Sequence, residues 1–145
     1  MFKHILIPTD GSETARKAIG AGLRFAREAG AKVTCFYGIE DMNPHHVGVH
    51  PSPQVQAEIE KRTRQIAELA VGEVLELAKK EGVAVDTQIM PVSSAHEGIV
   101  ATARDRGCDL ILMASHGRGA LSSLMTGSVT LKVLATSTIP VLVYR

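Results

Sequence analysis

Five short apolar runs alternate along the chain with four longer segments of helical periodicity. The apolar runs have the length of buried strands and cover residues 2–7, 32–39, 83–90, 109–114 and 139–144. The helical segments follow the first four runs and cover residues 12–29, 53–81, 94–107 and 127–136. Strands that alternate with helices in this way predict one α/β domain over residues 1–145: a doubly wound, five-stranded parallel sheet with helices on both faces.

The helical segments carry recognisable start and stop signals. Ser12 is placed to cap the first helix, which ends at Gly30, and Ser52-Pro53 starts the second, which ends at Gly82. The apolar stripe of the first helix is Ala15, Ala18, Ile19, Gly22, Phe25, Ala26 and Ala29. The predicted apolar side of the second is Val55, Ile59, Ile66, Leu69, Val74 and Leu77. The spacing of a capping box predicts the start of the third helix at Ser94 and Glu97.

The charge balance and the few aromatic residues narrow the class of function. The 145 residues include 16 Lys and Arg against 15 Asp and Glu, a net charge of +1, and aromatic residues make up 3% with no Trp. A nucleic-acid binder of this size usually has a basic surplus or aromatic rings for base stacking, so we expect no nucleic-acid partner. The core is expected to consist of Val, Ile, Leu and Ala, which suits a parallel sheet covered by helices.

The two cysteines and the short apolar runs indicate the compartment. Cys35 and Cys108 lie in or beside apolar runs and outside any Cys-x-x-Cys pair, so both are expected to be reduced and buried. We see no signal peptide and no apolar run of the ~20 residues that span a bilayer. The expectation is a cytoplasmic protein with no membrane partner.

The candidate site follows from where open α/β sheets bind ligands, which is beyond the carboxyl ends of the strands where strand order reverses. Three segments follow strand ends there, at residues 8–12, 38–41 and 114–128. The last, ASHGRGALSSLMTGS, combines three glycines with a His and an Arg, and it ends at the N-terminus of the last predicted helix. Unpaired N–H groups and the helix dipole at such an N-terminus attract phosphate. A loop that only caps the helix is the alternative.

Other nucleotide-binding motifs do not fit this chain. No GxxxxGK[ST] is present, which excludes a Walker-type NTPase. Gly117-Arg118-Gly119 begins a dinucleotide-binding pattern, but Ser122 stands at the position of its last glycine. Asp10 follows the first strand and has two possible roles: it accepts hydrogen bonds from a ribose or a base, or it makes a turn that caps the first helix.

Over nearly its whole length the chain resembles a single-domain universal stress protein. The segments that carry the resemblance are ILIPTDGSETARKAI, SAHEGIVATARDRGCDLILMASHG, the glycine loop to GSV, and the C-terminal IPVLVYR. ATP-binding members of that family carry the pattern G-x2-G-x9-G-[ST]. Gly117 and Gly127-Ser128 match its later positions, and Ala114 replaces its first glycine. The resemblance implies a Rossmann-like fold similar to that of adenine nucleotide alpha hydrolases.

The resemblance also implies how ATP, ADP or AMP would bind, with Mg²⁺ able to accompany the nucleotide. Adenine and ribose would lie near Pro8, Thr9, Asp10, Gly38 and Met113. The phosphates would lie on Gly117, Gly127, Ser128 and Val129. The departure at Ala114 costs roughly 1–2 kcal/mol if that position needs a positive φ, and only the volume of a methyl group near the ligand if the backbone is extended.

The histidines and Arg118 could either bind a ligand or have an ordinary structural role. His116 and Arg118 either bind phosphate or are ordinary loop residues. His4 lies inside the first strand and is expected to be structural. Three more histidines lie in a Pro- and Gly-rich loop before the long helix: His45, His46 and His50. A solvated loop fits this segment better than a zinc site, because its glycine and prolines disfavour the helix that would bring two imidazoles together.

The residues favour binding over catalysis. No GxSxG elbow is present, and Asp10 is the only carboxylate expected in the crevice. We therefore predict a stress-responsive regulator that binds ATP or a related adenine nucleotide and is not a dedicated enzyme. The alternatives are a nucleotide-free stress protein that acts through protein–protein contacts, and a weak ATPase. The resemblance implies a homodimer through the last strand, Val141 to Tyr144, and a protein partner of unknown identity.

Overall fold

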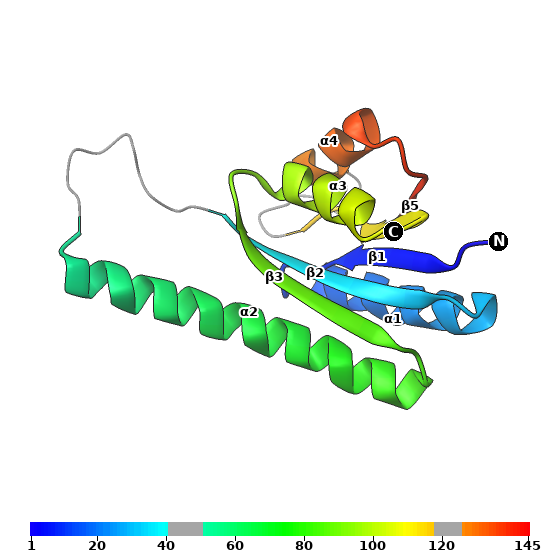
Figure 1. Cartoon of the computed structure of the whole chain (residues 1–145), viewed down its shortest axis with the longest axis horizontal. Helices are drawn as coiled ribbons and strands as arrows, with labels where there is room; N and C mark the ends of the chain where they lie inside the picture. Colours follow the sequence, from blue (N-terminus) through cyan, green and yellow to red (C-terminus); the bar gives the residue numbers. More distant parts are fainter. Residues whose placement is uncertain (41–50, 118–125) are drawn as a thin grey trace.

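The computed structural model describes residues 1–40, 51–117 and 126–145 and contains the predicted sheet (Figure 1). The elements in chain order are β1 (His4–Pro8), α1 (Glu13–Ala29), β2 (Lys32–Glu40), α2 (Pro53–Glu81), β3 (Val85–Val92), α3 (Ala95–Asp105), β4 (Leu110–Ala114), α4 (Ser128–Thr136) and β5 (Val141–Tyr144). The strands are parallel and lie in the order β3-β2-β1-β4-β5. Helices α1 and α2 cover one face and α3 and α4 the other. The predicted doubly wound architecture is confirmed.

Central strand β1 sends its side chains alternately into two apolar clusters. Ile5 and Ile7 belong to the cluster under α1 and α2, and Leu6 belongs to the cluster under α3 and α4. All three are fully buried, as expected for a strand covered on both faces. Phe36 of β2, the largest of the fully buried side chains, lies in the second cluster. The core is otherwise almost entirely aliphatic, which agrees with the composition.

The predicted ends of the first two helices are confirmed. The Ser12 hydroxyl accepts a hydrogen bond from Ala15 N at 3.2 Å, and the Ser52 hydroxyl accepts one from Val55 N at 3.3 Å. Gly30 and Gly82 end the helices with φ of 62° and 69°, in the left-handed region that glycine tolerates.

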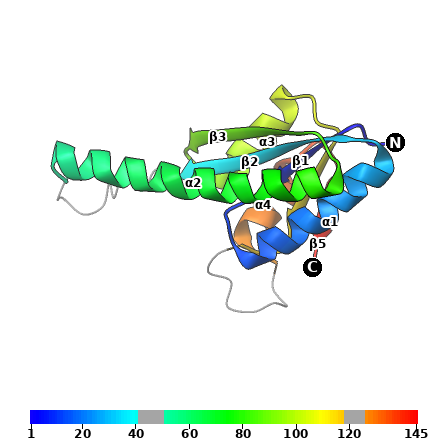
Figure 2. The same ribbon diagram turned by 90° about the horizontal axis from the view of Figure 1, so that it is seen from below.

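The predicted apolar side of α2 is wrong over most of its length. Val55, Ile59, Ile66 and Leu69 are between 42% and 72% exposed. The buried residues are Ala67, Ala70, Val71, Val74 and Ala78. Small side chains let this part of α2 lie close to the sheet, whereas its N-terminal half extends beyond the sheet (Figure 2). No helix among residues 1–40, 51–117 and 126–145 has the length and apolar character needed to cross a membrane.

The capping box predicted at the start of α3 does not form. Ser94 is the N-cap, but its side chain makes no capping bond. The first helical N–H, of Ala95, donates instead to Glu40 Oε1 at 2.9 Å. The Glu97 carboxylate accepts from the Ser93 hydroxyl at 3.0 Å, and this bond lowers the pKa of Glu97. The carboxylate that caps α3 therefore comes from the end of β2, a contact that sequence spacing does not reveal.

His4 and the two cysteines are buried, which agrees with the structural roles expected for them. His4 Nε2 lies 2.7 Å from Thr34 Oγ1, and burial lowers the pKa of His4. Both cysteines are buried and free. Burial raises the pKa of Cys35 to about 12 and that of Cys108 to about 11, so both thiols stay protonated at neutral pH.

Candidate functional site

A cavity of about 530 Å³ lies at the carboxyl ends of the strands, where strand order reverses between β1 and β4. Its lining includes every predicted site residue that the structure describes: Pro8, Thr9, Asp10, Gly38, Met113, Ala114, His116, Gly117, Gly127, Ser128 and Val129. Arg118 lies outside the described residues, as do the histidines at 45, 46 and 50. The structure thus brings together residues that come from three strands and one helix.

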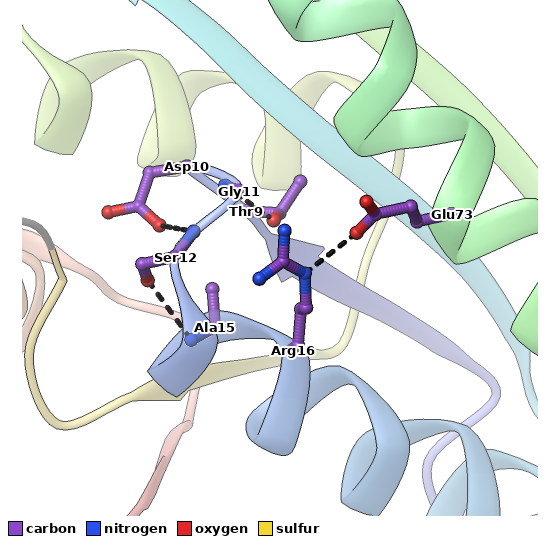
Figure 3. A network of polar contacts seen from close by, with 7 residues as sticks. All are labelled: Thr9, Asp10, Gly11, Ser12, Ala15, Arg16 and Glu73. Carbon is purple, nitrogen blue, oxygen red and sulfur yellow. Dashed lines mark hydrogen bonds and ion pairs between the residues drawn. The ribbon is translucent and has the colours of Figure 1, made fainter.

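The segment after β1 is a tight turn that fixes the Asp10 carboxylate (Figure 3). Thr9 Oγ1 accepts from Gly11 N at 3.1 Å, and Asp10 Oδ1 accepts from Ser12 N at 2.9 Å. Gly11 has a φ of 77°, which few other residues tolerate. Asp10 therefore makes the turn and also borders the cavity, so the two roles considered for it are compatible. The cap of α1 is Ser12.

The two motif glycines allow close packing rather than an unusual backbone. A Cβ at Gly117 would lie 2.4 Å from Asp10 Oδ2, and one at Gly127 would lie 3.1 Å from His116 Cα. The first distance is far below van der Waals contact. Glycine at position 117 is therefore what lets the segment after β4 approach the Asp10 turn, and the two segments together form one wall of the cavity.

The start of α4 lines the cavity. Gly127 is the N-cap, with φ −66° and ψ 155°, and it has no side chain to cap the helix. Gly127 N donates to Ser115 O at 2.6 Å, and the Thr130 hydroxyl donates to Ala114 O at 3.0 Å. The N–H groups of Ser128 and Val129 belong to the first turn, where an α-helix offers no internal acceptor. This end of the cavity therefore favours an anion.

The backbone conformation at Ala114 shows whether alanine is strained in place of the first glycine of the motif. Ala114 is the last residue of β4, and no non-glycine residue in the described segments has a positive φ. The alanine is thus unstrained. Its only cost to a ligand is the volume of one methyl group at the cavity wall.

The His116 ring is held between two hydroxyl groups. Its Nδ1 lies 3.0 Å from Ser115 Oγ, and its Nε2 lies 3.3 Å from Thr14 Oγ1. Both ring nitrogens thus have partners, which favours the structural interpretation of this histidine over that of a phosphate ligand. Thr14 was not predicted from the sequence, because its contact with the segment after β4 is made only in the fold.

Sequence reasoning missed part of the cavity wall. The cavity is also lined by Ala15, Phe36, Tyr37, Ile39, Glu40, Thr63, Ile66, Ala95, Ile99 and Thr130. Glu40 corrects the expectation that Asp10 is the only carboxylate in the crevice. Ile39 and Glu40 lie in the flagged segment after the second strand, so their positions were detectable. No sequence signal indicated Thr63 and Ile66, since they lie in the middle of a helix.

Comparison with known proteins identifies the family. The family model described as "Universal stress protein family" matches residues 1–145. The universal stress protein YxiE of Bacillus subtilis is 32% identical, with all of both chains covered. The solved structure of MJ0577, a universal stress protein of Methanocaldococcus jannaschii, is 31% identical with a TM-score of 0.85, covering 99% of this chain and 95% of that one. The chain belongs to the universal stress protein family.

More distant solved structures share the fold and carry ligands. A universal stress protein in complex with cAMP has a TM-score of 0.74 at 17% identity, covering 99% of this chain and 97% of that one. One from Archaeoglobus fulgidus in complex with dAMP has a TM-score of 0.68 at 15% identity, covering 100% and 98%.

Proposed function

We propose that this protein is a stress-responsive regulator that binds ATP or a related adenine nucleotide, without dedicated catalysis. The observation that carries the proposal is the start of α4, where Ser128 and Val129 line a cavity at the switch point of the sheet. The cAMP and dAMP bound by more distant relatives support an adenine nucleotide as the class of ligand.

In this proposal each part of the cavity holds one part of the nucleotide. The first turn of α4 and the Ser128 hydroxyl hold phosphate, the Asp10 carboxylate accepts from the ribose, and Gly38 and Met113 lie beside the base. The described residues contain no group of three His, Cys, Asp or Glu side chains that could hold a metal ion. Mg²⁺ would therefore be held mainly by the phosphates of ATP.

Calorimetric titration with ATP, AMP and cAMP tests the proposal. We expect saturable binding of at least one of them, and roughly two- to fivefold tighter binding by Ala114→Gly, because the variant removes a methyl group from the cavity wall. A nucleotide-free stress protein predicts no heat of binding at millimolar nucleotide for either protein. That outcome would reject the proposal.

We also propose that two copies pair through β5. This strand lies at the edge of the sheet, and Leu142 is partly exposed there. Ile111 N donates to Pro140 O and Ser115 N donates to Tyr144 O, so the backbone groups of Pro140 and Tyr144 face β4. Because these groups alternate along a strand, those of Val141 and Val143 face outward and are available to a second strand.

Val143→Pro is expected to convert the proposed dimer to a monomer. Proline removes one outward N–H and leaves the bonds between β4 and β5 in place. Val143→Thr keeps that N–H and should remain dimeric. Light scattering after size-exclusion chromatography gives the mass of each protein, and a wild-type monomer at all concentrations would exclude this interface.

A further inference from the structure

The two ends of the cavity differ in electrostatic character. At one end lies the N-terminus of α4, where the helix dipole is positive and the N-cap Gly127 provides no capping side chain. At the other end Glu40 Oε1 already accepts from Ala95 N at the start of α3. The carboxylate compensates the positive end of that helix and repels a phosphate. The strands β2 and β4, which carry the two ends, flank β1 and are about 10 Å apart. A nucleotide with phosphate at α4 therefore extends toward Glu40.

Helix α2 borders the Glu40 end of the cavity. Thr63 and Ile66 line the cavity, as do Tyr37 and Ile39 of β2, the strand that ends at Glu40. Ile66 is 49% exposed, whereas the next residue, Ala67, is fully buried against the sheet. A ligand that fills this end would remove much of the Ile66 side chain from water. Apolar burial of this kind favours a flat heteroaromatic ring over a sugar or a phosphate.

The position of α2 is fixed relative to the rest of the site. Val71 and Val74 are buried against the sheet, and this burial stabilises the packing of α2. Glu73 Oε2 also accepts from Arg16 Nε at 2.7 Å, close to the turn that carries Asp10 (Figure 3). This ion pair joins α1 to α2, although a surface pair of this kind contributes little stability. Ile66 and Asp10 therefore belong to one preformed site.

We infer that α2 is the base-side wall of the nucleotide site, with Ile66 packed against the ring of the bound base and Thr63 at its edge. The inference rests on the proposed nucleotide binding and extends it by assigning a specificity-determining residue. It predicts that affinity depends on Ile66 only for ligands that carry a base. Inorganic triphosphate, which needs only the α4 end, should be insensitive to this residue.

Methyl NMR of protein labelled at the isoleucine Cδ1 groups detects the contact directly. Saturation with AMP should shift the Ile66 methyl signal through the ring current of the base, with Ile66→Val providing the assignment. Ile59 is the matched control, because it lies on the same helix, is 42% exposed and does not line the cavity. Inorganic triphosphate should leave both signals in place. Saturation with AMP that leaves the Ile66 signal unmoved overturns the inference.

Affinity measurements give a second, independent readout. We expect Ile66→Ala to weaken AMP binding about three- to tenfold and Ile66→Glu to weaken it further. Leu69→Glu, at a position that is 72% exposed and outside the cavity, should bind as the wild type does. Equal losses in Ile66→Glu and Leu69→Glu would reject the assignment. If the wild-type protein binds no adenine nucleotide, the proposed function itself fails, and the wild-type titration distinguishes that case.

Discussion

Ser128→Pro is expected to weaken adenine-nucleotide binding about 10- to 100-fold while leaving the fold intact. The substitution deletes both the N–H and the hydroxyl that the proposal places on phosphate. Position 128 is the first residue of α4, where proline is tolerated, and the preceding Gly127 already has the extended backbone that proline requires. Isothermal titration with AMP and ATP measures the loss, and the thermal midpoint measures the integrity of the fold.

Ser128→Ala is the matched control for this experiment. It removes the hydroxyl but keeps the N–H, so we expect a loss intermediate between the wild type and the proline variant. A 10- to 100-fold loss corresponds to about 1.4–2.8 kcal/mol in total for the N–H and the hydroxyl together. If the proline variant binds as tightly as the wild type, the phosphate does not lie at the start of α4.

Phe36→Ala is expected to lower the free energy of unfolding by about 3–5 kcal/mol. The ring is only 1% exposed and fills space that two glycines leave open. A Cβ at Gly98 would lie 2.9 Å from the ring, and one at Gly38 would lie 3.2 Å from it. Urea denaturation followed by circular dichroism measures the change.

Comparison with Phe36→Leu shows how much of the lost stability is due to lost side-chain volume. Leucine restores much of the buried area, so its cost should be clearly smaller than that of alanine. Because Phe36 also lines the cavity, the alanine variant enlarges the base-side space next to Gly38. A cost below about 1 kcal/mol for Phe36→Ala would mean that the core relaxes to fill the gap.

The fold was predictable because its signals are local. Apolar runs bounded by Ser12, Gly30, Ser52 and Gly82 define the strands and helices, and all four end signals act as predicted. The failures have tertiary causes. The apolar side of α2 was wrong for two reasons: the N-terminal part of the helix extends past the sheet, which leaves Val55 and Ile59 exposed, and Leu69 lies on the outer side of the helix. Periodicity records which residues are apolar, but it does not record where the neighbouring layer ends.

The part of the candidate site formed by residues that directly follow the strands was predictable from the sequence. Asp10, Gly117 and Ser128 follow β1 or β4 and meet at the same edge of the sheet. The contact between Asp10 and Gly117 joins segments more than 100 residues apart, so the need for glycine there is visible only in the fold. The same holds for the Glu40 carboxylate on α3 and for Ile66 on α2. Each of these contacts joins elements that no local pattern links.

The hydrogen bond from Gly127 N to Ser115 O ties the start of α4 to the residue that follows β4. Both partners are backbone atoms, so the end of the strand and the start of the helix are fixed to each other directly. The proposed anion site is therefore placed by a main-chain contact and not by a side chain.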